Sequence, residues 1–209
     1  MNKEDRLQEL LFYEKELWQK DIKYIAGADE VGRGPLAGPV VVGAVILNPK
    51  TVELLAGVDD SKKLSAKRRE QLNPIIKKEA LCWALGWRNS RQIDEEGIAV
   101  SIQKALQLAI SRLSVSPQHL LLDAFSAPQI MLPQTSIIKG DSKSATIAAA
   151  SIIAKCFRDD LMIKLDGVYP NYGFASHKGY GTAAHIAVLR EQGRCPQHRR
   201  SFKVKGVDY

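Results

Sequence analysis

Acidic side chains stand at three places where the sequence predicts the ends of buried strands. Asp29 and Glu30 follow an apolar run, Asp123 follows three leucines, and Asp141 follows a second short apolar segment. Carboxylates in such places are costly unless they are paired, hydrogen-bonded or bound to a cation. Because strand ends on one edge of a sheet converge, the four acids predict a site for Mg²⁺ or Mn²⁺, which prefer oxygen ligands. Two such ions support phosphodiester hydrolysis by activating water and stabilising the leaving oxygen.

Some of these acids also have an interpretation without chemistry. Asp141 precedes a predicted helix, so on its own it is better explained as an N-cap. Asp123 comes directly after its apolar run and is harder to explain as a surface acid. Neighbours on a strand point to opposite faces, so Asp29 and Glu30 reach one site only if the strand breaks there. Gly32 would permit such a break.

The segment Gly32-Arg33-Gly34 is suited to a phosphodiester ligand. Glycine lets the backbone come close to a ligand, and arginine supplies a planar cation that matches phosphate. Tyr180 stands between glycines in a polar loop, where it either stacks on a sugar or base or simply anchors the loop. Lys62 lies in another loop, where a phosphate contact and a solvated position are equally good interpretations.

The composition favours a polyanionic partner. Lysine and arginine number 30 against 23 acids, for a net charge of +7. The run His198–Ser201 suits phosphate but is equally an ordinary basic tail, and residues 67–69 fit the solvated face of a helix. Three cysteines without metal-type spacing, no apolar signal core and no membrane-length run predict a protein of the reducing cytoplasm. The spacing around Gly140 is not that of a phosphate-binding Walker loop, which argues against a nucleoside triphosphatase.

Periodicity places these residues on predicted elements. Apolar runs predict a pair of strands flanking the first glycine-rich segment and three further strands over residues 81–87, 119–123 and 135–139. Helical spacing and small residues predict helices over residues 66–79, 98–113, 142–166 and 182–192. We predict an N-terminal amphipathic helix over residues 1–20 and one domain over 21–209. A meander followed by strands alternating with helices indicates an α/β fold with a mixed sheet flanked by helices.

With these features in place, the chain resembles the ribonuclease HII family, the bacterial type 2 ribonucleases H. Matching segments occur in the family's order over roughly residues 24–202: Ala28–Gly38, Asp60–Ser65, Leu122–Ala124, Lys139–Ser142, Ala148–Lys155, His177–Tyr180 and His198–Phe202. The family's glycine after the third acid is Ala124 here, a departure that leaves the acid in place.

The resemblance implies a ribonuclease H-like fold and cleavage of the RNA strand of RNA–DNA hybrids. It also implies incision on the 5′ side of a single ribonucleotide in duplex DNA, leaving a 5′-phosphate and a 3′-hydroxyl, as in ribonucleotide excision repair. By the same resemblance the metal-binding acids, all facing one site, are Asp29, Glu30, Asp123 and Asp141. The residues that sense the 2′-hydroxyl are Gly32, Arg33, Gly34 and Tyr180, and the expected phosphate contacts are Lys62, Ser151 and Lys155.

Two other classes of function compete with a metal-dependent nuclease. A non-catalytic nucleic-acid-binding protein would use the basic loops alone, but the presence of all four acids argues against it. A small-substrate phosphatase would use the acids alone, but the basic excess and the Gly-Arg-Gly segment argue against that. We expect a monomer that acts on RNA–DNA hybrids and ribonucleotide-containing duplex DNA, with no membrane association.

Overall fold

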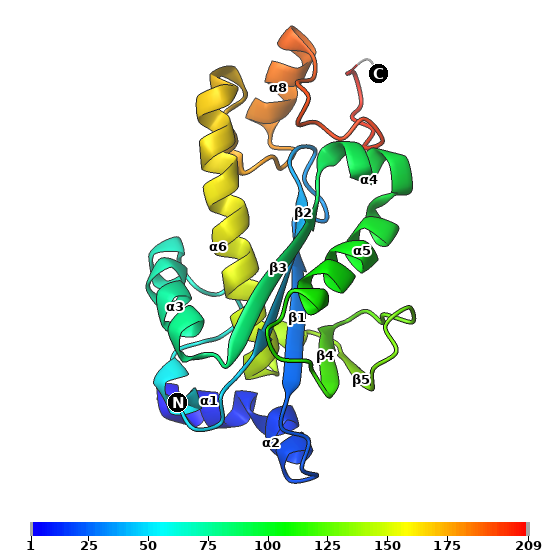
Figure 1. The fold of residues 1–209 in the computed structure, drawn as a ribbon. Helices are drawn as coiled ribbons and strands as arrows, with labels where there is room; N and C mark the ends of the chain where they lie inside the picture. Colours follow the sequence, from blue (N-terminus) through cyan, green and yellow to red (C-terminus); the bar gives the residue numbers. More distant parts are fainter. Residues whose placement is uncertain (1, 208–209) are drawn as a thin grey trace.

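The computed structural model describes residues 2–207, which are built around one five-stranded sheet (Figure 1). The strand order is β3-β2-β1-β4-β5. The strands are β1 (Ile25–Val31), β2 (Val40–Ile46), β3 (Cys82–Arg88), β4 (His119–Asp123) and β5 (Gln134–Ile137). The first three pair antiparallel, whereas β4 pairs parallel with both β1 and β5. The predicted α/β class with a mixed sheet is confirmed.

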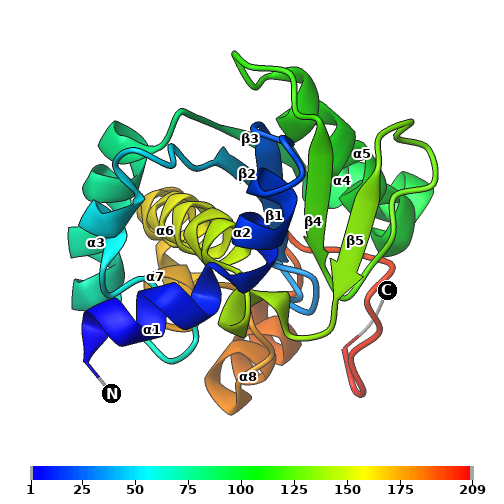
Figure 2. The same cartoon turned by 90° about the horizontal axis from the view of Figure 1, so that it is seen from below.

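Helices cover both faces of the sheet, which explains why β2 is buried at every position. One face carries α6 (Ala145–Val168) with α3 (Ala66–Glu79), and the other carries α5 (Ile98–Ser111) (Figures 1 and 2). The remaining helices are α1 (Lys3–Leu10), α2 (Phe12–Trp18), α4 (Ser90–Glu96), α7 (Phe174–His177) and α8 (Ala183–Gln192). Short 3₁₀ turns are η1 (Val52–Leu55), η2 (Gly140–Ser142) and η3 (Pro170–Tyr172). No helix within residues 2–207 is long and apolar enough to cross a bilayer.

Helix α6 lies unusually close to the sheet because glycines face it. A Cβ added to Gly27 would lie 2.4 Å from the backbone carbon of Thr146, and one added to Gly43 would lie 2.4 Å from the carbonyl oxygen of Ala150. Neither contact is tolerable, so only glycine fits at these two positions. The small residues of α6 complete this approach, as the sequence predicted.

The N-terminal segment differs from its prediction. The sequence favoured one helix over residues 1–20, but the structure has α1 and α2 separated at Leu11. The chain turns there because its apolar side chains belong to different clusters. Leu7 and Leu10 pack into the core under α6, whereas Leu17 packs beside Ile25 at the start of β1.

Two other helices, predicted over residues 66–79 and 182–192, begin with a side-chain cap. The hydroxyl of Ser65 accepts a hydrogen bond from the backbone N–H of Arg68 at 3.2 Å, directly before α3. Thr182 caps α8 in the same way through the N–H of His185 at 3.3 Å. Side-chain acceptors at these positions satisfy N–H groups that the helix itself leaves without partners.

An ion-pair network at the edge of the sheet makes stability depend on pH. Arg88 of β3 donates to Glu96 of α4 at 2.8 Å, and Ser101 and Lys104 of α5 donate to the same carboxylate. These bonds, led by that of Arg88, lower the pKa of Glu96 to about 2. A depressed carboxyl pKa stabilises the fold above its unfolded value of about 4.3, and the stabilisation is lost as the pH falls through the folded value.

We therefore expect the free energy of unfolding to decline between about pH 4.5 and pH 2, and the Glu96→Gln variant to show a shallower decline. Urea denaturation at closely spaced pH values measures both slopes. Glu95→Gln, which removes a surface pair with Arg91, is the matched control and keeps the parent slope. Equal slopes in all three proteins would contradict the prediction.

Candidate active site

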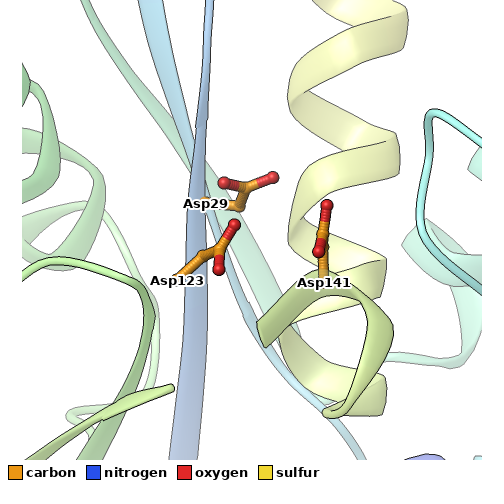
Figure 3. A group of neighbouring side chains, drawn as sticks. All are labelled: Asp29, Asp123 and Asp141. Carbon is orange, nitrogen blue, oxygen red and sulfur yellow. The ribbon is translucent and has the colours of Figure 1, made fainter. Parts of the chain in front are cut away.

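Three aspartates from separate elements converge beside the sheet (Figure 3). Carboxylate oxygens of Asp29, Asp123 and Asp141 all lie within 4.8 Å of one another. Asp29 lies in β1 and Asp123 ends β4; the parallel register pairs Ala28 with Leu122, so the two acids are the next residues on neighbouring strands. Their convergence follows from strand pairing, as the sequence predicted.

Asp141 reaches the group by a different route from the predicted one. The fifth strand ends at Ile137, before the predicted boundary of 139, and Asp141 lies in the turn η2. The alternative interpretation of Asp141 as an N-cap is wrong, because the cap of α6 is Ser144. The backbone N–H of Gly140 donates to Asp123 Oδ1 at 2.6 Å, which ties this turn to the end of β4.

The electrostatics of the three acids fit a divalent cation. Burial, reinforced by the neighbouring carboxylates, raises the pKa of Asp29 to about 8, against a hydrogen bond from Ser151 that lowers it. Burial also raises the pKa of Asp141, although the Lys62 ammonium lies 3.1 Å from its carboxylate and opposes the shift. A bound cation relieves this repulsion, and three carboxylates are a donor set that Mg²⁺ or Mn²⁺ accepts. Asp123 and Asp141 line a pocket of about 530 Å³.

Glu30 lies next to this group but outside it. Strand β1 remains regularly paired through Val31, so the strand break that would turn Glu30 toward the face of Asp29 is not present. The backbone changes only at Gly32, whose φ is +89°. Burial raises the pKa of Glu30, and the guanidinium of Arg33, 3.7 Å away, lowers it. The role of Glu30 as a fourth metal ligand stays a prediction.

Two buried arginines hold the loop that follows β1. Arg199 donates to the carbonyl oxygens of Gly32, Arg33 and Gly38 over 2.5–3.0 Å. Arg158 of α6 donates to those of Ala37, Pro39 and Lys178 over 3.0–3.1 Å. Both side chains are fully buried. The carbonyl groups of Gly32 and Arg33 therefore face inward onto fixed donors, which holds the conformation of the turn.

Sequence reasoning missed this role for both residues. Arg199 belongs to the run interpreted as a phosphate contact or a solvated tail, and its burial excludes the solvated tail. Burial, with the charge of Arg158 second, lowers the pKa of Arg199 to about 9. The sequence did hold a signal for Arg158. Ala154, Arg158 and Met162 are four residues apart, which places them on one face of α6, and all three are buried.

Comparison with known proteins agrees with this geometry. Residues 26–205 match the sequence profile of ribonuclease HII. The chain belongs to the ribonuclease HII family. It is 50% identical over 198 residues to ribonuclease HII of Anaeromyxobacter sp. strain Fw109-5, covering 95% of this chain and 62% of that relative. It is 46% identical to ribonuclease HII of Moorella thermoacetica, covering 95% and 96%.

Solved structures of the same family have the same fold. Ribonuclease H2 of Pyrococcus horikoshii OT3 aligns with a TM-score of 0.73 at 28% identity, covering 86% of this chain and 93% of that one. Ribonuclease HII of Archaeoglobus fulgidus, solved in complex with PCNA, aligns with a TM-score of 0.71 at 29% identity, covering 87% and 96%. The chain is thus a ribonuclease H enzyme with the fold that the sequence resemblance implied.

The residues that the ribonuclease HII resemblance assigned to substrate lie at different depths. Tyr180 is 42% exposed, so it is accessible to a ligand. Its backbone carbonyl accepts a hydrogen bond from His185 at 2.9 Å, which helps to fix the backbone at this position. Lys62 lies at the pocket. Ser151 is buried, 2.8 Å from the Ser61 hydroxyl, and Lys155 pairs with Asp159 at 2.9 Å. Contacts of these residues with a phosphate stay predictions.

Proposed function

We propose that this enzyme hydrolyses the RNA strand of RNA–DNA hybrids and incises duplex DNA on the 5′ side of a single embedded ribonucleotide. The products are a 5′-phosphate and a 3′-hydroxyl, which suits ribonucleotide excision repair. The observation that carries the proposal is the convergence of Asp29, Asp123 and Asp141 in a chain of the ribonuclease HII family. Asp123 and Asp141 also line a pocket beside this group. No membrane and no second copy of the chain enters the proposal.

The chemistry divides between a metal ion and the protein. Mg²⁺ or Mn²⁺, when held by the three aspartates, supplies an activated water and stabilises the leaving oxygen. Lys62 offsets the negative charge of Asp141, which eases the approach of a phosphodiester. Arg33 is largely exposed beside Glu30 and offers a planar cation to the phosphate backbone.

Selection of a ribonucleotide requires contact with the 2′-hydroxyl, the group that distinguishes RNA from DNA. We assign this contact to the backbone of Gly32–Gly34 together with Tyr180. Support comes from the two buried arginines, because a loop whose carbonyl groups are fixed presents the same backbone surface to every substrate. A preorganised contact of this kind loses little entropy on binding.

The proposed function is tested by incision of a DNA duplex that contains one ribonucleotide, in Mg²⁺, in Mn²⁺ and in chelator. An all-DNA duplex of the same sequence is the control. We expect metal-dependent cutting on the 5′ side of the ribonucleotide and an intact control. Cutting of both duplexes would agree with the proposed metal site but would contradict the proposed recognition of the 2′-hydroxyl. No cutting in any metal would favour a binding protein that uses only its basic loops.

Substitutions at Tyr180 separate its ring from its hydroxyl. We expect Tyr180→Phe to reduce incision only a few-fold, and Tyr180→Ala to reduce it by roughly 10- to 100-fold, since stacking on a nucleotide contributes about 1–3 kcal/mol. Incision rates at saturating metal measure both effects. Equal and slight losses in the two variants would exclude a stacking role.

A further inference from the structure

The two N-terminal helices contact the segment that carries Asp141. Arg6 of α1 donates to the carbonyl oxygen of Ser142 at 2.8 Å. Glu14 of α2 is fully buried, and its Oε1 accepts from the Ser144 hydroxyl at 2.6 Å and from the backbone N–H of Thr146 at 2.9 Å. Figures 1 and 2 place α1 and α2 at the end of α6 where that helix begins. Both helices thus form hydrogen bonds with residues 142–146, the segment that follows Asp141.

Arg6 also holds a second segment that approaches Asp141. Its guanidinium forms a two-bond contact with the Asp59 carboxylate, at 2.9 and 3.2 Å. Asp59 accepts from the N–H of Asp60, and Asp60 accepts from the N–H of Lys62, each at 2.8 Å. The ammonium of Lys62 then reaches Asp141. One arginine therefore organises both the backbone after Asp141 and the loop whose lysine contacts it.

Asp141 needs such support more than the other two aspartates do. Asp29 pairs with Gly43 and Asp123 with Ile137 in the sheet, so strand pairing fixes their backbones. Asp141 lies in a three-residue 3₁₀ turn that follows Lys139 in the left-handed conformation. A short 3₁₀ turn has weak hydrogen bonds of its own, so its position depends on the contacts made around it.

We propose that Arg6 and Glu14 are positioning residues that keep the Asp141 turn at the distance where its carboxylate joins those of Asp29 and Asp123. The proposal rests on the proposed function, since it concerns the same metal site. It assigns a role in that site to α1 and α2, which lie before residue 26, where the family match begins. In this proposal the two helices contact the residues that follow Asp141, and they contact neither the substrate nor the metal ion.

The test compares metal binding in variants of matched stability. Arg6→Met keeps the length of the stem and removes the guanidinium, and Glu14→Ala removes the acceptor. Glu14→Gln retains an acceptor oxygen and serves as the conservative rescue. Leu7→Ala, or Leu7→Val if the former does not fold, is the matched control, because Leu7 is buried on α1 within the core cluster. The first readout is the rise in Tm that millimolar Mg²⁺ causes without nucleic acid. The second readout is the Mg²⁺ concentration for half-maximal incision, measured at a temperature well below the Tm of every variant.

We expect Arg6→Met and Glu14→Ala to raise the half-saturating Mg²⁺ concentration by about 10-fold, the lower end of the effect of partners behind metal ligands, and to diminish the Mg²⁺-induced rise in Tm. Glu14→Gln should stay close to the parent, and the Leu7 variant should lower Tm while keeping the parent's Mg²⁺ response. If Arg6→Met and Glu14→Ala lower Tm but keep the parent's Mg²⁺ response, the helices only stabilise the fold and the proposal is overturned. A parent that neither incises nor gains Tm from Mg²⁺ would overturn the proposed function itself, and with it this inference.

Discussion

Replacing Asp123 by Asn is expected to abolish incision while leaving duplex binding intact or tighter. Asp123 is one of three carboxylates within 4.8 Å, and its loss removes one of the ligands that we propose for the metal ion. We expect incision to fall by more than about 100-fold, because the loss of groups that merely support ligands already costs 10- to 100-fold. The amide oxygen of Asn still accepts from the N–H of Gly140, as Asp123 Oδ1 does, so the turn before α6 stays attached. Binding is retained because one negative charge fewer faces the phosphate backbone.

Single-turnover incision and duplex affinity, measured at one salt concentration, separate these two effects. The control is Asp160→Asn, a change of equal charge at an exposed position of α6. We expect the control to incise like the parent. If the Asp123→Asn enzyme incised at the parent rate, Asp123 would not be a metal ligand. If it bound the duplex more weakly than the parent, the expected gain from removing one negative charge would be contradicted.

Replacing Arg199 by Lys is expected to damage both stability and ribonucleotide selection. The guanidinium serves three carbonyl groups at once, whereas one ammonium on a flexible stem cannot reproduce that fork. At about 1–3 kcal/mol for each buried group left without a partner, we expect the free energy of unfolding to fall by roughly 2–4 kcal/mol. We also expect incision at a single ribonucleotide to fall by at least about 10-fold, since the Gly-Arg-Gly loop would no longer be fixed.

The matched control lies next in the chain. Arg200 is exposed and only its backbone N–H contacts Asp94, so Arg200→Ala should change neither quantity by much. Urea denaturation gives the stability, and incision of the ribonucleotide-containing duplex is compared with cleavage of a continuous RNA–DNA hybrid. A loss of cleavage that is equal for both substrates would show that selection of the ribonucleotide does not depend on Arg199. A stability like that of Arg200→Ala would contradict the predicted contribution of the Arg199 hydrogen bonds to folding.

Predictions from the sequence were accurate where local pattern decides structure. The apolar runs that end at Asp29 and Asp123 located two of the three clustered aspartates on neighbouring strands, and the helical spacing over residues 66–79 located α3. The sequence also indicated Asp141, but as the end of a strand or as a helix cap. The left-handed Lys139 and the short 3₁₀ turn after it leave no periodic pattern in the sequence. The split at Leu11 was missed because two different clusters, both made of distant residues, bury the two halves of the segment.

The burial of Arg199 was missed for a related reason. An arginine in a basic run normally predicts exposure, and only the folded loop brings together the carbonyl oxygens that compensate its burial. Likewise, nothing in the sequence indicates that Arg6 and Glu14 meet residues 142–146, because such contacts join segments more than a hundred positions apart. These are the features that tertiary structure alone determines.

The order of strands in the sheet also determines when the nuclease centre forms during folding. Strands β1 and β2 form an antiparallel hairpin across residues 32–39, and contacts between segments so close in sequence are the faster ones to make. The parallel pairing of β1 with β4 joins Ile25 to His119 and must close a long loop first. Asp29 lies in this local hairpin, whereas Asp123 and Asp141 come beside it only when that long loop is closed. We therefore expect cutting activity to appear only once the pairing of β1 with β4 is made.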